Sequence, residues 1–177
     1  MIQYCKRCCL PSTKPHLSFD EEGICNACRN YENRKNVDWD ERKKELMEIL
    51  DRYRSKDGSN WDCIIPVSGG KDSTYQVITM LELGMNPLCV TATTCDLTDI
   101  GRRNIENIKK MGVDYIEVTT NRVVRAKLNR IGLTEVGDIS WPEHVSIFTV
   151  PVRIAVNFNV PLIIWGENSQ NEYGGPA

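Results

Sequence analysis

The sequence lacks a surplus of basic residues. Its 177 residues include 22 Lys and Arg against 24 Asp and Glu, which gives a formal net charge of -2. The balance is even along the chain, with 12 basic and 11 acidic residues in positions 1–60 and 10 and 13 in positions 61–177. A protein that grips a nucleic-acid backbone over a wide surface is strongly basic, so nucleic acid is not the expected partner.

Long apolar runs are also missing. The N-terminal "MIQYCKRCCLPSTKP" has no apolar run of signal-peptide length, and no stretch approaches the roughly 20 apolar residues of a membrane span. We therefore predict a cytoplasmic protein without membrane association. The final "GENSQNEYGGPA" follows an apolar segment without a closing helix, so we expect a longer protein with further active-site residues beyond position 177.

Hydrophobic residues make up 41% of the chain, enough for the core of one sizeable domain with a small appendage. From position 61 onward, short apolar runs alternate with helical patterns, which predicts an α/β fold with a Rossmann-like parallel sheet covered on both faces. Strands are expected at 62–67, 87–94, 115–120 and 161–166, and helices at 72–83 and 99–111. The stretch 140–159 is expected to be helical in its second half, kinked or started by Pro151.

Eight cysteines are many for a protein of a reducing compartment, where disulfides are rare. The pairs Cys5-x-x-Cys8 and Cys25-x-x-Cys28 enclose 16 residues, a spacing typical of a structural four-thiolate zinc site. Residues 1–34 have too few apolar residues for a core, so we interpret them as a zinc ribbon. Cys9 is either a neighbour of the site or an alternative to Cys8, and the chance that His16 replaces a ligand is small.

A helix and linker are predicted over residues 35–60. In "DWDERKKELMEILDRYR", Asp38 can cap the helix N-terminus with Glu41 three residues on, and "SKDGSN" ends the helix. Leu46, Ile49, Leu50 and Tyr53 fall on one face.

The loop "SGGKDS" at 68–73 follows the first predicted strand of the remaining domain, residues 61–177. It is not a Walker A loop, because Ile65 stands where the first glycine is needed and Asp72 follows Lys71. Two glycines before a helix N-terminus still favour an anion. The anion ligands would be Ser68, Gly69, Gly70, Lys71 and Ser73, and Asp72 would hold Mg²⁺ against phosphates.

This hexapeptide after an apolar strand resembles the signature loop of the PP-loop (N-type) ATP pyrophosphatases. The resemblance implies cleavage of ATP between the α and β phosphates, with the loop holding the departing pyrophosphate and Lys71 and Asp72 in catalytic roles. It also implies adenine contacts near Ala92 and Thr93 at the end of the second strand.

The run "YCKRCCLPSTKPHLSFDEEGICNACRNY", with "TCDLTDIGRRNIENIKKMGVD", "SWPEHV" and "PLIIWGENSQNEYGG", resembles the N-acetyl sugar amidotransferases of bacterial surface-polysaccharide (lipopolysaccharide, O-antigen) and flagellin-sugar biosynthesis. That resemblance implies that the acetamido oxygen of a nucleotide-linked sugar attacks ATP, after which ammonia displaces AMP to give an acetamidino sugar. A separate glutaminase subunit, with a cyclase-like subunit, would supply the ammonia, since the chain has no glutaminase nucleophile motif.

Two alternatives remain open. A PP-loop tRNA thiolation enzyme also carries zinc-binding cysteine pairs, but such enzymes use several further cysteines, and only Cys95 follows the second strand here. A non-catalytic zinc-ribbon module would be expected to have lost positions of the loop, and every one is filled.

Further candidates lie near the predicted carboxyl edge of the sheet. Arg102 and Arg103 open a predicted helix, where the dipole disfavours cations, so anionic substrate groups could be their purpose. Glu167 is a candidate for substrate positioning or proton handling, and Asn168 for a hydrogen bond to substrate. His144 is either an acid or base or a structural residue at a helix start.

Overall fold

The structure is a computed structural model that describes residues 1–94 and 96–167. The chain divides into two compact units, one of Met1–Glu48 with Glu167 and the other of Ile49–Gly166. Each unit has its own internal organisation, described separately below. No helix in the described part of the chain is long and apolar enough to cross a membrane.

The first unit begins with two tight turns closed by antiparallel bridges, Tyr4 to Pro11 and Phe19 to Cys25. Helix α1 (Asn26–Asn33), a short 3-10 turn η1 (Arg34–Asn36) and α2 (Trp39–Tyr53) follow. The Asp38 carboxylate accepts a hydrogen bond from the Glu41 backbone N–H at 3.0 Å, so the predicted cap of α2 is confirmed. Of the predicted apolar face of α2, only Leu50 is fully buried, while Ile49 and Tyr53 are exposed.

The second unit is built on a parallel sheet of β1 (Cys63–Pro66), β2 (Pro87–Thr93) and β3 (Asp114–Thr119), in the order β1-β2-β3. Cys63 pairs with Pro87 and Leu88 with Asp114, which fixes the register. Every residue of β1 but the last is buried, as the near-continuous apolar run predicts for a strand covered on both faces. The predicted α/β class with a parallel sheet is therefore confirmed.

The fourth predicted strand, 161–166, is reduced to a single parallel bridge between Ile163 and Ile64. The Ile64 N–H donates to the Leu162 carbonyl and the Ile164 N–H donates to the Ile64 carbonyl, each at 2.9 Å. The next donor on that side of β1 would be residue 66, which is a proline and has no N–H. The predicted strand is wrong in extent because β1 cannot continue the ladder, but its place beside β1 is clear.

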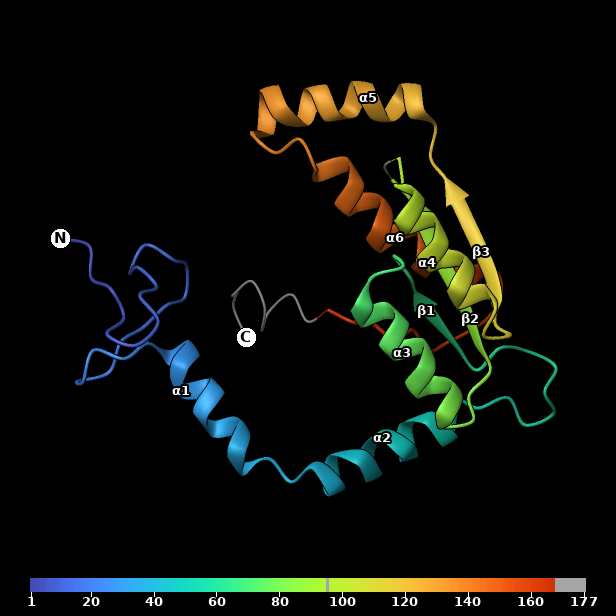
Figure 1. Ribbon diagram of the computed structural model, residues 1–177, viewed down its shortest axis with the longest axis horizontal. Helices are drawn as coiled ribbons and strands as arrows, with labels where there is room; N and C mark the ends of the chain where they lie inside the picture. The colour runs from blue at the N-terminus through green and yellow to red at the C-terminus, as the bar shows by residue number, and fades with distance from the viewer. Residues whose placement is uncertain (95, 168–177) are drawn as a thin grey trace. The chain divides into compact units, whose positions relative to one another are not determined.

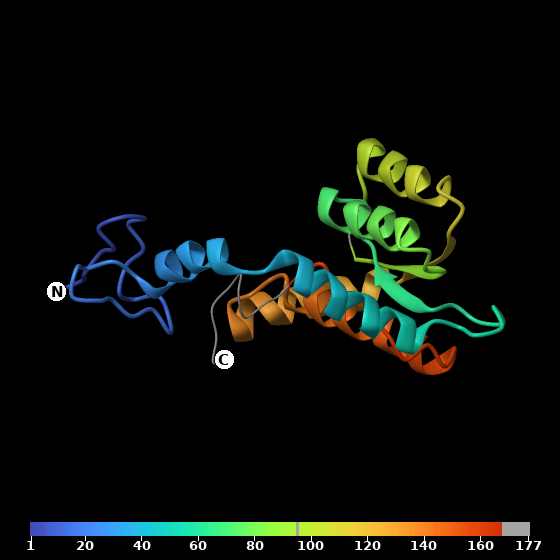
Figure 2. The ribbon, with the colours of Figure 1, turned by 90° about the horizontal axis from the view of Figure 1, so that it is seen from below.

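Helices cover both faces of this sheet (Figures 1 and 2). One face carries α3 (Lys71–Glu82) and α4 (Asp99–Lys109), and the other carries α6 (Trp141–Asn157), with α5 (Arg122–Ile131) beside α6. The core between the sheet and α6 consists of Ile64, Leu88, Val90, Ala155 and Val160.

Helix α6 is continuous through Pro151 and starts at Trp141, so the expectation of a kink or start at Pro151 is wrong. The proline costs the helix one backbone hydrogen bond, to the Ile147 carbonyl. Its ring is buried, and its burial offsets part of that cost. Helix α5 and the π-helical turn η2 (Gly132–Val136) were not expected from the sequence.

Candidate functional site

The four cysteines singled out by their spacing come together in the first unit. The sulfur atoms of Cys5, Cys8, Cys25 and Cys28 all lie within 4.8 Å of one another, and those of Cys8 and Cys25 are 3.5 Å apart. Four thiolates around a tetrahedral zinc ion, each about 2.3 Å from the metal, lie roughly 3.8 Å apart. The donor set and its spacing therefore fit zinc, and the cluster could hold it as a closed structural site.

Backbone amides stabilise the thiolate form of Cys5, the form that binds a metal. Burial raises the pKa of Cys5, but hydrogen bonds from the backbone N–H groups of Cys8, Cys25 and Arg7 outweigh it and lower that pKa to about 6. The contact with the Cys8 sulfur, together with burial, raises the pKa of Cys28 to about 12. A bound dication would favour the thiolate form of all four, since zinc binding releases thiol protons.

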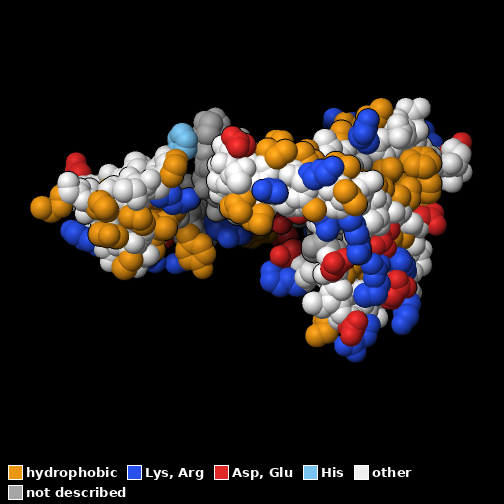
Figure 3. Space-filling view, turned by 90° about the horizontal axis from the view of Figure 1, so that it is seen from above, with side chains coloured by type: hydrophobic (Ala, Val, Ile, Leu, Met, Phe, Trp, Pro, Cys, Tyr) orange, Lys and Arg blue, Asp and Glu red, His pale blue; other side chains and the backbone are white. Residues whose placement is uncertain are grey.

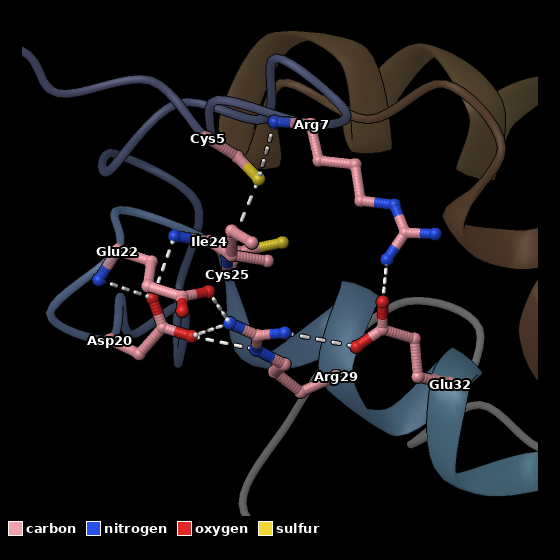
Figure 4. Close-up of polar contacts among 8 residues, drawn as sticks. All are labelled: Cys5, Arg7, Asp20, Glu22, Ile24, Cys25, Arg29 and Glu32. Carbon is pink, nitrogen blue, oxygen red and sulfur yellow. Dashed lines mark hydrogen bonds and ion pairs between the residues drawn. The ribbon is translucent and has the colours of Figure 1, made fainter.

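An ion-pair network lies beside the cluster (Figure 4). Arg29 contacts three carboxylates, with nitrogen–oxygen distances of 2.7 Å to Asp20 and 3.1 Å to Glu32 and a further contact to Glu22. Glu32 also pairs with Arg7. Because Arg7 lies inside the first cysteine pair and Arg29 follows the second, the network ties the two halves of the site together. The network consists of Arg7, Asp20, Glu22, Arg29 and Glu32.

The remaining candidates of this unit lie outside the cluster. Cys9 is exposed, with φ of +61°, and is not one of the four clustered sulfurs. His16 is an exposed loop residue, also with positive φ, and is not part of the cluster either. The cluster therefore uses Cys8, not Cys9.

In the second unit, the loop 67–70 connects the end of β1 to the start of α3. Gly69 has φ of +79°, a conformation that favours glycine. A Cβ atom at this position would lie 3.2 Å from Ile105 Cγ1 and 3.4 Å from Asn104 Cβ, both on α4. The loop backbone is therefore pressed against α4, and only glycine fits there without a shift.

The N-terminus of α3 is open. Gly70 is the N-cap residue, and no side chain caps the helix. The N–H groups of the first turn, from Lys71 to Ser73, therefore remain available for an anion, and the helix dipole favours one.

Three hydroxyl groups form hydrogen bonds within this loop. The Ser73 hydroxyl donates to the Gly70 carbonyl at 3.2 Å and accepts from the Ser68 N–H at 3.4 Å. The Ser68 hydroxyl accepts from the Gly70 N–H at 3.3 Å, and the Thr74 hydroxyl donates to the Gly70 carbonyl at 2.9 Å. Ser73 thus acts on the loop itself, while the Ser68 hydroxyl keeps its hydrogen for another acceptor.

The charged residues of the loop are exposed. The Lys71 ammonium lies 2.6 Å from the Asp72 carboxylate, and the two side chains are 87% and 71% exposed. An exposed pair of this kind contributes little stability and can exchange partners readily. Lys71 could therefore exchange Asp72 for a phosphate, and Asp72 offers a carboxylate of the kind with which a phosphate-bound Mg²⁺ is held.

The position of the loop in the sheet favours ligand binding. From β1 the chain proceeds to β2 and β3 on one side, whereas Ile163 pairs on the other side of β1. The strand order therefore reverses at β1, and parallel α/β sheets bind ligands beyond the carboxyl ends of strands at such a switch point.

The ends of β2 and β3 carry a polar cluster that the sequence analysis did not assign. Glu117 of β3 forms two-pronged contacts with Arg102 of α4, with a closest distance of 2.8 Å. The Thr93 hydroxyl donates to the same carboxylate at 2.8 Å. Hydrogen bonds from Arg102, opposed by partial burial, hold the pKa of Glu117 below its usual value. An acidic residue inside the otherwise apolar "YIEVTT" was a signal for this cluster.

The structure separates the two arginines that were grouped as substrate ligands. Arg102 is engaged by Glu117, while Arg103, one residue on, is exposed and makes no ion pair with the described residues. Ala92 and Thr93 lie half-buried at the carboxyl end of β2, one strand from the loop. His144 is exposed in the first turn of α6. Glu167 is exposed, and Asn168 and Cys95 lie outside the described residues.

No protein-family model matches the chain. A stretch of 99 residues is 31% identical to an uncharacterized protein of Methanocaldococcus jannaschii, covering 55% of this chain and 35% of that protein. The chain thus spans about a third of that relative.

Among solved structures, the chain resembles the NH3-dependent NAD synthetase of Campylobacter jejuni, with a TM-score of 0.56 and 13% identity over 76% of this chain and 58% of that one. It also resembles the NMN synthetase of Francisella tularensis, with a TM-score of 0.54 and 14% identity over 73% and 55%. At this identity the likeness concerns the fold alone, and it supports the α/β parallel-sheet fold predicted from the sequence.

Proposed function

We propose that this chain binds ATP at the loop 67–73 and acts in an AMP-forming amidotransferase reaction. The observation that carries the proposal is the uncapped N-terminus of α3, presented by a loop pressed against α4 at the point where strand order reverses. Such a site supplies backbone N–H groups to a di- or triphosphate. The NAD synthetase with the same fold is described as NH3-dependent, which supports a reaction that consumes ammonia.

The proposed acceptor is the acetamido group of a nucleotide-linked sugar, on the strength of the resemblance to the N-acetyl sugar amidotransferases. The amide oxygen forms a bond to the α phosphorus, and the bond from that phosphorus to the bridging oxygen breaks to release pyrophosphate. Ammonia then adds to the activated carbon, a proton is lost, and AMP leaves with the former amide oxygen. Activation is required because the amide oxygen alone is a poor leaving group.

The residues of the loop have separate tasks in this proposal. The N–H groups of the first turn of α3 and the Lys71 ammonium bind the departing pyrophosphate, whose developing charge they stabilise. Asp72 would hold Mg²⁺, which supplies charge neutralisation at the phosphates. Glu167 and Asn168 are proposed to position the sugar or to accept the proton lost from ammonia. Arg103 is the better candidate of the two arginines for anionic substrate groups, since Arg102 is held by Glu117.

A cytoplasmic glutaminase subunit, with a cyclase-like subunit, is the proposed source of ammonia. No nucleic-acid partner is proposed, because the chain has no overall basic surplus.

The cysteines of the sheet favour amidation over tRNA thiolation. Cys63 and Cys89 are fully buried in β1 and β2, and burial raises the pKa of each thiol to about 12. Thiols of this kind are inert as nucleophiles and as ligands of an iron–sulfur cluster. Outside the zinc site, the described residues therefore contain no accessible cysteine except Cys9.

The proposal is tested by incubating the protein with ATP, Mg²⁺, isotope-labelled ammonium and an acetamido-sugar nucleotide, with tRNA and a sulfur donor offered in parallel. We expect AMP and pyrophosphate together with a sugar that has gained the labelled nitrogen. Formation of ADP and phosphate would refute the assignment of the cleaved bond. Transfer of sulfur to tRNA would refute the acceptor.

A matched pair of variants separates the role of the loop from a general effect of charge. Asp72→Asn should abolish AMP formation. Asp51→Asn should leave it unchanged, because Asp51 is likewise an exposed aspartate beside a basic partner, Arg54, but lies on α2. Equal activity of the two variants would remove the metal-binding role of Asp72.

A further inference from the structure

Helix α5 turns its polar side toward the molecule. The Asn129 amide donates to the Glu143 carboxylate at 2.8 Å and to the Ile139 carbonyl at 2.6 Å. Arg125, one turn earlier, lies 4.0 Å from the same carboxylate, and its side chain is only 19% exposed. The polar contacts of α5 with α6 are thus made by an arginine and an asparagine, and none of the residues of α5 is fully buried.

A second side of α5, roughly a quarter turn from these contacts, is apolar and exposed. Val124, Leu128 and Ile131 follow at helical spacing and are 52%, 39% and 53% exposed. The stripe continues beyond the helix with exposed Leu133, Val136, Ile139 and Trp141. Single exposed apolar residues are ordinary, but a contiguous set of this size marks an interaction surface. Figure 3, seen from the side of α5, shows apolar side chains gathered there among basic ones.

The charges around this stripe are separated by sign along the chain. Lys127 and Arg130 flank the apolar side of α5, and the helix contains no acidic residue. Glu135 and Asp138 follow it, and no basic residue lies between positions 131 and 143. None of these four side chains makes an ion pair with any residue that the structure describes.

We propose that the surface from Val123 to Trp141, which we call the α5 face, is the interface between two copies of this chain related by a two-fold axis. A two-fold interface uses the same patch on both copies, so the patch must complement itself. With the axis crossing the α5 face, the basic helix of one copy meets the acidic segment of the other, and the two apolar stripes cover each other. An anionic membrane or a uniformly charged partner would be repelled by one half of the patch.

The oligomeric state is measured by sedimentation equilibrium of the intact chain. We expect a dimer, and a double variant with Val124→Asp and Ile131→Asp that is monomeric. The matched control is Val156→Asp, at a valine of α6 that is 71% exposed and lies outside the α5 face, and it should remain dimeric. A monomeric wild-type chain, or a dimer indifferent to the double variant, would overturn the proposal. So would a monomer that binds anionic vesicles through this face.

Charge exchange provides a second test that does not depend on removing apolar contacts. Lys127→Glu and Glu135→Lys should each weaken self-association by about tenfold or more, because each places like charges together twice in the dimer. An equimolar mixture of the two variants should recover a mixed dimer. Failure of the mixture to associate, with both variants folded by circular dichroism, would show that these charges do not face each other.

Discussion

The contact between the phosphate loop and α4 can be tested with two glycines that share one backbone conformation. Gly69 has φ of +79° and Gly58 has φ of +68°. Alanine in this left-handed region costs about 1–2 kcal/mol relative to glycine. The two substitutions to alanine therefore carry the same conformational penalty.

The surroundings of the two glycines differ. At Gly58 a new methyl group meets no atom within 4 Å, whereas at Gly69 it meets Ile105 Cγ1 at 3.2 Å and the Gly101 carbonyl oxygen at 3.5 Å. Carbon atoms prefer separations of roughly 3.5–4.0 Å, so the loop or α4 must move. Overpacking of this kind typically costs about 1 kcal/mol or more. Gly69→Ala should therefore lose about 2–3 kcal/mol of unfolding free energy and Gly58→Ala about 1–2 kcal/mol.

Urea denaturation followed by circular dichroism measures both losses. A double-mutant cycle with Ile105→Ala adds the decisive control, because removing the facing side chain should reduce the cost of Gly69→Ala. Displacement of the loop should also reduce the thermal stabilisation by Mg-ATP in Gly69→Ala but not in Gly58→Ala. Equal losses in the two single variants, with no coupling to Ile105, would refute the close packing of the loop on α4.

Three further outcomes are expected. Chelation of zinc, or Cys5→Ser, should expose residues 1–34 to proteolysis, because only Cys5, Gly23 and Cys25 are buried among those residues. The thermal transition of the second unit should stay in place. Retained protection of residues 1–34 would argue against a metal-dependent fold. Arg29→Met should accelerate zinc loss to a chelator, measured with a metal-sensitive dye, whereas Arg42→Met, which breaks the exposed pair with Glu45 on α2, should not. The lowered pKa of Glu117 implies a contribution to folding stability that is present above about pH 4.3, the usual glutamate pKa, and is lost as pH falls through the lower pKa of the folded state. Glu117→Gln should remove this acid-dependent part of the denaturation profile. An unchanged profile would contradict the stabilising role of the ionised Glu117 carboxylate.

The parts of the fold that depend on local pattern could be predicted from the sequence. The alternation of apolar runs and helical periods located β1, β2, β3, α3 and α4. The "SGGKDS" loop located the N-terminus of α3, the helix that follows β1. The cysteine spacing identified the clustered thiols, because two C-x-x-C turns each place two sulfur atoms on one side of a common centre.

The last strand was predicted too long because its extent depends on a neighbour about 100 positions away. Pro66 interrupts the ladder on the side of β1 that faces Ile163, and nothing within 161–166 reveals this. Glu117 was missed for a related reason. Its role follows from the parallel register, which pairs it with Thr91 and so brings the Thr93 hydroxyl, two residues further along β2, within hydrogen-bond reach. It also follows from α4, which supplies Arg102.

The orientation of α5 is the feature that local reasoning would have reversed. An amphipathic helix on a soluble domain ordinarily turns its apolar side inward, so "RVVRAKLNRI" would be assigned an inward Val124, Leu128 and Ile131. The observed orientation satisfies the Glu143 carboxylate through Asn129 and leaves Val124, Leu128 and Ile131 39–53% exposed. Full burial of an aliphatic side chain is worth about 1.5–3 kcal/mol, so the proposed dimer would recover the part of that energy that the half-covered side chains of α5 lack in the single chain. If the charge-exchange pair restores a dimer, the orientation of α5 is explained by the surface that it presents to a second copy.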